Sequence, residues 1–260
     1  MRPERASGWC AIALACGLLA ACASSGGGGV KKEDAATRNE EAARVHTQLG
    51  QKYMQQGKLE LALDKLNKAL SFDSGYADAH TVIALLYEKI GELKQAEEHY
   101  RRAVELKPKS GNELNNYGAF LCKLGRYDEA DGYFIQAVAD PFYKTPAVAL
   151  TNAGTCLVKA GKYAAAENDL RQAVERAPDY AEGLFQLASV LYRKGDYFHA
   201  RAFEQRFESV AQARPESLLL GRNIELKLGN GDAAREYTRR LLQGFPDSEQ
   251  ARALNPPNTP

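Results

Sequence analysis

The sequence predicts an all-α protein in which six helix pairs stack into a solenoid, and two periodic features support this prediction. A glycine recurs with spacings of 34, 34, 36, 34 and 34 residues, at Gly57, Gly91, Gly125, Gly161, Gly195 and Gly229. An alanine stands five residues after each glycine, at Ala62, Ala96, Ala130, Ala166, Ala200 and Ala234. Apolar residues three and four apart give each expected helix one buried stripe. Because one pair cannot bury its stripe alone, neighbouring pairs must stack.

The amino terminus has the features of a lipoprotein signal peptide, which we predict at residues 1–21. Two arginines precede an apolar run at 9–19, which is too short for a membrane-spanning helix of about 20 residues. The segment Leu-Ala-Ala-Cys at 19–22 resembles the bacterial lipobox, which implies cleavage before Cys22 and covalent lipid on that residue. An ordinary secretory peptide with a chance cysteine is the alternative, and Cys16 fits the motif less well.

The segment after the lipobox predicts where the protein is held. No aspartate follows Cys22, and in lipoproteins of this type that absence implies the periplasmic face of the outer membrane. Residues 22–42 are expected to be the lipidated cysteine and a flexible tether that leads into the first helix, because the Ser/Gly-rich run at 24–29 has no side chains for a core. More than one acyl chain would attach the protein stably without a spanning helix.

The 34-residue period and the small-residue pattern resemble the tetratricopeptide repeat. The first helix of each repeat carries variants of Leu49-Gly50-Tyr53, and the second helix carries variants of Ala62-Leu66-Ala69. This resemblance implies a right-handed superhelix in which the periodic glycine ends the first helix in a left-handed conformation. We place the six repeats at 43–76, 77–110, 111–146, 147–180, 181–214 and 215–248.

Two regions depart from the repeat pattern. The segment 140–146 contains two prolines and two extra residues, so we expect a longer turn between repeats three and four. Repeat six has Arg222 and Glu225 where glycine and tyrosine usually stand, as expected of a terminal repeat that caps a solenoid. Residues 249–260 are predicted to be a C-terminal tail.

Composition argues against nucleic-acid binding, and the motifs argue against catalysis. The chain has 34 Lys and Arg against 33 Asp and Glu, and removal of residues 1–21 leaves 32 of each. A neutral chain lacks the surplus of cations that phosphate binding needs. The four histidines have no metal-ligand spacing, and no nucleophile–base motif or phosphate loop is present. We therefore predict a protein that is not an enzyme, with no metal and no cofactor beyond the lipid on Cys22.

Two cysteines remain in the body of the chain, at Cys122 and Cys156. They are 34 residues apart, on the first helices of adjacent repeats, which are neighbours in a stacked solenoid. An oxidising periplasm would permit a disulfide between them. The alternative is a pair of buried free thiols, because cysteine also packs as a small apolar residue.

The tetratricopeptide resemblance also implies a binding surface, because in that family the first helices line the concave face. The residues of the central repeats that fall on or beside this face are Asn112, Asn115, Asn116, Lys123, Thr151, Asn152, Thr155, Lys159, Phe185, Ser189, Tyr192 and Arg193. Amides can bond a peptide backbone and the two aromatic rings offer apolar contacts, so the surface suits a partner's extended segment or helix. The alternative is that these are merely solvated positions.

Several longer segments resemble one family, the type IV pilus biogenesis and stability lipoproteins (the PilF/PilW group). They are Asn-Asn-Tyr-Gly at 115–118, Asp-Pro-Phe-Tyr-Lys-Thr-Pro at 140–146, Asn-Ala-Gly-Thr-Cys at 152–156 and Glu-Ser-Leu-Leu-Leu-Gly at 216–221. The resemblance implies a pilotin or assembly factor that binds the secretin subunit of the pilus machinery and supports its localisation or multimerisation, and thereby twitching motility. We expect the protein itself to be a monomer. An adaptor for another outer-membrane or cell-wall assembly machine would share the fold and the lipid. A lipid-anchored hydrolase would need a nucleophile–base pair.

Overall fold

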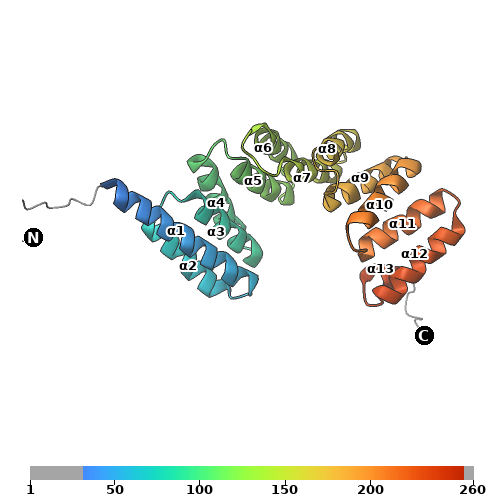
Figure 1. Cartoon of the computed structure of the whole chain (residues 1–260), viewed down its shortest axis with the longest axis horizontal. Coiled ribbons are helices and arrows are strands. Elements are labelled where there is room, and N and C mark those ends of the chain that lie inside the picture. Colours follow the sequence, from blue (N-terminus) through green and yellow to red (C-terminus); the bar gives the residue numbers. More distant parts are fainter. Residues whose placement is uncertain (1–31, 255–260) are drawn as a thin grey trace, which may run out of the picture.

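The computed structural model describes residues 32–254, which form a chain of helices joined by short turns (Figure 1). The predicted signal peptide, Cys22, the segment up to residue 31 and residues 255–260 lie outside the described residues. Within 32–254 there are thirteen helices and no strand, so the all-α solenoid prediction is confirmed. The helices are α1 (Lys32–Gln55), α2 (Leu59–Phe72), α3 (Ala77–Ile90), α4 (Leu93–Leu106), α5 (Gly111–Lys123), α6 (Tyr127–Ala139), α7 (Pro146–Lys159), α8 (Tyr163–Arg176), α9 (Ala181–Lys194), α10 (Tyr197–Val210), α11 (Pro215–Lys227), α12 (Gly231–Gly244) and α13 (Glu249–Leu254).

The turn inside each helix pair is built on the periodic glycine. All six glycines have φ between 74° and 85°, the left-handed region that a side chain disfavours. At Gly91 the backbone N–H donates to Glu88 O, and the N–H of Glu92 donates to Tyr87 O at 2.9 Å. These bonds satisfy carbonyls at the end of α3 and reverse the chain, so the predicted helix stop is confirmed.

Small residues let the two helices of a pair approach closely. A Cβ added at Gly154 on α7 would lie 2.5 Å from Leu170 Cγ on α8, closer than packed carbon atoms allow. In the sixth pair, the residue at the closest approach of the two helices differs from the one expected from the repeat spacing. Its close-approach position is Gly221, whose added Cβ would lie 2.5 Å from Tyr237 Cε1, and not Arg222. The large ring of Tyr237 occupies the interface, so the glycine that precedes Arg222 faces it.

The pairs stack so that the first helices lie on the inner side of an arch (Figure 1). Each first helix packs against the first helix of the next pair, from α1 with α3 through to α9 with α11. Within the described residues, the backbones of second helices in neighbouring pairs do not approach each other as closely, and α10 and α12 meet through side chains. Because the inner side of a curved stack is the more crowded one, α3, α5, α7 and α9 form its inner face.

Both ends of the solenoid differ from the expected boundaries. Helix α1 begins at Lys32, so residues 32–42 of the predicted tether are helical. Residues 249–254 of the predicted tail form α13, where Ala251 is buried against Leu218 and Leu241. This short helix covers apolar surface that a seventh pair would otherwise bury. Among residues 32–254, no helix has the length and apolarity needed to cross a bilayer.

Candidate binding surface on the first helices

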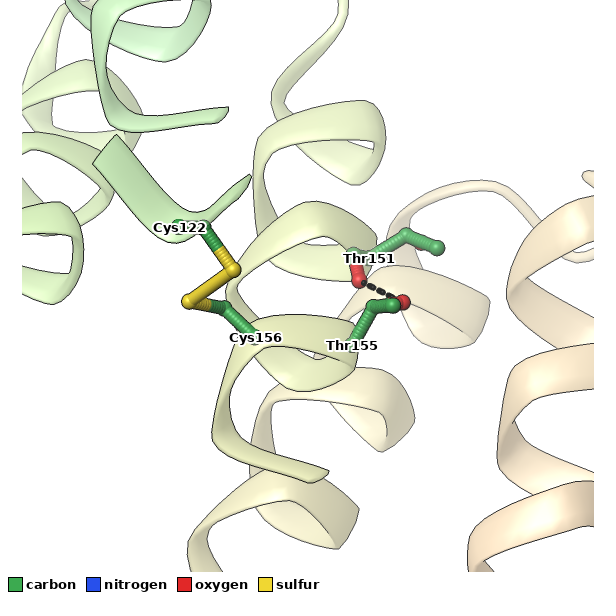
Figure 2. The surroundings of a disulfide bond; sticks show 4 residues. All are labelled: Cys122, Thr151, Thr155 and Cys156. Atoms are coloured by element: carbon green, nitrogen blue, oxygen red, sulfur yellow. Dashed lines mark hydrogen bonds between the residues drawn. A yellow bond between two sulfur atoms is a disulfide. The ribbon is translucent and has the colours of Figure 1, made fainter. Parts of the chain in front are cut away.

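A disulfide joins two first helices in the middle of the inner face. Cys122 on α5 and Cys156 on α7 are bonded through their Sγ atoms, with their Cα atoms 5.8 Å apart (Figure 2). Both residues are buried. Of the two arrangements that the sequence allows, the structure therefore contains the bridge, which holds α5 and α7 together across a separation of 34 residues.

Beside the disulfide, two predicted surface amides bond to each other. Asn152 Nδ2 on α7 donates to Asn115 Oδ1 on α5 at 3.0 Å, and Asn115 is only 7% exposed. Asn115 therefore joins helices and is not a free contact for a partner, which corrects its expected role. Asn112 is exposed and Asn116 half-buried on the same helix, so these two amides remain accessible.

The hydroxyl groups on the inner face are largely engaged within the protein. Thr155 Oγ1 donates to Thr151 O at 2.8 Å (Figure 2), and Ser189 Oγ donates to Phe185 O at 2.9 Å. Thr151 itself is buried, so it too is not the surface residue we expected. Lys123 is exposed and pairs with Glu88 on α3, whereas Lys159 and Arg193 are exposed on α7 and α9.

The two predicted aromatic contacts are partly covered. The guanidinium carbon of Arg214 lies 4.1 Å from the ring centre of Phe185, and the Phe207 ring lies 5.7 Å away. Tyr192 is half-buried, with its ring centre 5.5 Å from that of Tyr197. Neither ring is therefore a free apolar contact. The expected exposure of Phe185 is reduced by Arg214, on the connection into α11, because its guanidinium stacks on the Phe185 ring.

A cavity of about 220 Å³ opens on the inner face between α1, α3 and α5. Asn112 and Asn116, the two predicted amides that remain accessible, line this cavity. Thr81 and Glu113 also line it, and neither was predicted from the sequence as a site residue. A signal existed for Glu113, because it occupies a repeat position that holds small residues elsewhere, at Ala79, Ala149 and Gly183.

Charge within this cavity is mostly negative. Glu113 is only 4% exposed, and burial raises the pKa of its carboxyl. The nearest cation is Lys107, whose Nζ lies 3.9 Å from Glu113 Oε1 and 2.7 Å from Asp78 Oδ1. One half-exposed ammonium group therefore faces two carboxylates.

Two histidines that looked scattered in the sequence meet between α3 and α4. Nδ1 of His80 lies 3.0 Å from Nδ1 of His99, and His80 Nε2 lies 3.2 Å from Ser74 O. Burial lowers the pKa of both imidazoles, which favours two neutral rings joined by one N–H···N hydrogen bond between their Nδ1 atoms. Within the part of the chain that the structure describes, no three His, Cys, Asp or Glu side chains gather as a metal site would need.

Similarity to known proteins agrees with this architecture. Residues 112–179 and 151–217 match the tetratricopeptide repeat family, as do residues 77–110. The type IV pilus assembly protein PilF of Pseudomonas aeruginosa is 31% identical over 209 residues, which cover 80% of this chain and 83% of that protein. The chain belongs to the PilF family.

Solved structures extend the PilF comparison to three dimensions. The structure of PilW, described as a widely conserved type IV pilus biogenesis factor, superposes with a TM-score of 0.76 at 33% identity, covering 82% of this chain and 97% of PilW. That of Pseudomonas aeruginosa PilF superposes with a TM-score of 0.75 at 29% identity, covering 84% of this chain and 98% of PilF. The common region is therefore nearly all of both solved chains.

Proposed function

We propose that this chain is an outer-membrane lipoprotein that acts, as a monomer, in assembly of the type IV pilus secretin. The observation that carries the proposal is its similarity to PilF and PilW along most of all three chains. The candidate lipobox at 19–22 supplies the attachment. Lipid on Cys22 and the outer-membrane location are parts of this proposal.

In this proposal the two parts of the molecule do different work. The lipid holds the protein at the membrane where the secretin must assemble. The inner face binds a segment of the secretin subunit, using the accessible amides of Asn112 and Asn116 for backbone hydrogen bonds and Leu85, which is 39% exposed, for apolar contact. Binding of this kind would keep secretin subunits from associating with other proteins until they multimerise.

Deletion of the gene in its host tests the assembly role. We expect loss of twitching motility and monomeric or mislocalised secretin in outer-membrane fractions, restored by the intact gene but not by the Cys22→Ser variant. Normal motility with normal multimers would remove the pilus role and favour an adaptor for another assembly machine.

A pair of matched variants tests the inner face. Leu85→Lys places a charge on α3 in the cavity, whereas Ile135→Lys places one on the second helix α6, where Ile135 is 63% exposed. If Leu85 contacts the partner, its variant should lower the affinity for the secretin subunit by roughly 30-fold, as expected for a central interface residue. The Ile135 variant should retain normal affinity. The opposite result would place the binding surface on the second helices.

A further inference from the structure

Two buried polar side chains in the inner-face cavity have an oxygen without a hydrogen-bond partner. Thr81 is 8% exposed and its Oγ1 has no partner, and Glu113 has none at Oε2. Three other helical threonines, Thr47, Thr155 and Thr238, satisfy their hydroxyl through the carbonyl four residues earlier at 2.8 Å, whereas Thr151 on α7 does not. Buried polar groups without partners are uncommon and costly, so these two require an explanation.

Glu113 is a buried carboxyl group, and its burial costs free energy of folding. Burial of a carboxylate destabilises a fold unless a partner compensates it, and the equivalent positions of neighbouring repeats hold alanine or glycine. The Ser110 hydroxyl, the Glu113 backbone N–H and Lys107 compensate it in part, although the Lys107 Nζ is closer to Asp78. On the opposite wall, Val82 and Leu85 present apolar surface. The cavity thus joins an excess of acceptors to an apolar wall.

We propose that this cavity receives a lysine or arginine side chain of the bound partner segment, an inference that rests on the proposed binding role of the inner face. The alkyl stem of the cation packs on Val82 and Leu85, and its N–H groups donate to Glu113 and Thr81 after rotation of these side chains toward the cavity. Asp78 at the rim adds attraction for the positive charge.

A peptide cation fits this site better than a bound metal ion. Hard cations need six or more oxygen ligands close together, and nowhere in residues 32–254 do three metal-ligating side chains gather. A long side chain that carries both an apolar stem and several donors matches both walls. The two accessible amides, Asn112 and Asn116, lie beside the cavity, where they can bond the backbone of the same segment.

The test uses a probe that does not depend on the identity of the partner. Acetyl-leucyl-arginine amide and its citrulline counterpart differ only in replacing the guanidinium by a neutral urea group. In NMR titrations of the purified full chain, the arginine peptide should shift the amides of Thr81, Val82 and Glu113, and should bind at least about tenfold more tightly than the citrulline peptide. Equal affinity of the two peptides, or shifts elsewhere only, would overturn the proposal.

Matched variants assign the binding to the two oxygens. Glu113→Gln removes the charge with little change of shape, and Thr81→Val removes the hydroxyl. Thr151→Val is the control for Thr81: its hydroxyl is also buried without a partner, at the same repeat position, but on α7 against Gly183. We expect Glu113→Gln to abolish the preference for arginine and Thr81→Val to weaken binding several-fold, with Thr151→Val unchanged. An arginine preference that survives both changes would overturn the proposal, and if Glu113→Gln misfolds, Thr81→Val against Thr151→Val decides alone.

Secretin multimers in cells then separate this inference from the proposed function. Arginine preference in the purified chain, together with normal secretin assembly after deletion of the gene, would retain the cavity and remove the pilus role. Loss of assembly on deletion without any arginine preference would retain the role and remove the cation site.

Discussion

The middle and the end of the solenoid use the same helix-pair frame but different chemistry at the junctions between neighbouring pairs. Between the third and fourth pairs, α5 and α7 are joined by the disulfide of Cys122 and Cys156 and by the amide bond from Asn152 to Asn115. Between the fifth and sixth pairs, a buried acid holds α10 to α12. Glu204 is 1% exposed, and its Oε2 accepts a hydrogen bond from the Tyr237 hydroxyl at 2.7 Å.

Glu204 occupies the repeat position that holds large apolar or aromatic residues elsewhere, at Leu66, Tyr100, Phe134 and Leu170. Its surroundings add charge: Glu208 also accepts from Tyr237, and Arg240 pairs with Glu208 at 2.6 Å. Burial raises the pKa of Glu204 to about 7. The repeat frame therefore tolerates a buried carboxyl where a side chain of the next pair donates a hydrogen bond to it, and the stability of this end depends on pH.

The largest expected effect comes from breaking the middle junction. The double variant Cys122→Ser, Cys156→Ser should lose about 4 kcal/mol of unfolding free energy, because the unfolded chain regains the freedom of a loop closed across 34 residues. Urea unfolding without reductant measures it, and the wild type in reductant should match the variant. Two free thiols titrated in the denatured, unreduced wild type would contradict the bridge.

The next largest effect is expected at Glu204, where the free energy of unfolding should depend on pH. Because the pKa of Glu204 rises from 4.5 to about 7 on folding, the wild type loses stability as pH increases through that window, by roughly 3 kcal/mol in all. The variant Glu204→Gln cannot ionise, so its stability relative to the wild type should increase by that amount between pH 4.5 and pH 8. Thermal unfolding across this range measures the gain.

Glu236→Gln is the control for that measurement. Glu236 is exposed on α12, where a hydrogen bond from Arg239 lowers the pKa of its carboxyl. This variant should show no gain that grows toward alkaline pH. A similar pH dependence in both variants would mean that a general charge effect, and not the buried carboxyl, sets the stability of this end.

The smallest effect is expected at the amide pair. Asn152→Ala removes the donor to Asn115 and leaves a buried acceptor unsatisfied, which should cost about 1–2 kcal/mol. Asn168→Ala on α8, an exposed position, is the control and should be near neutral. In a double-mutant cycle with Asn115→Ala, the two changes should not add. Additive losses would show that the two amides act independently.

The sequence could predict the helix pairs because their determinants are local and repeated. The six glycines are needed wherever the chain enters the left-handed region, and the six alanines wherever two helices touch. Family membership followed from motifs within single segments. The register of the sixth pair could not be predicted in this way, because the choice between Gly221 and Arg222 depends on where the Tyr237 ring packs.

The candidate binding surface was predicted only in part. Repeat position identified the helices that line the inner face, and two of its amides, Asn112 and Asn116, lie at the cavity. It did not indicate that Asn115 bonds across to Asn152, or that Arg214 covers Phe185. Those contacts join residues 37 and 29 positions apart, and they depend on side-chain directions that a repeat pattern does not specify.

By itself, then, the sequence determined the architecture: six helix pairs, small residues where helices touch and a family to which the chain belongs. Only the tertiary structure decided which polar groups find partners. Thr81 and Glu113 meet at one cavity, and Glu204 meets Tyr237, because stacking brings together residues from different pairs. The physical reason is that helix formation and close packing depend on short-range spacing, whereas satisfaction of a buried polar atom depends on what the neighbouring pair places within about 3 Å of it.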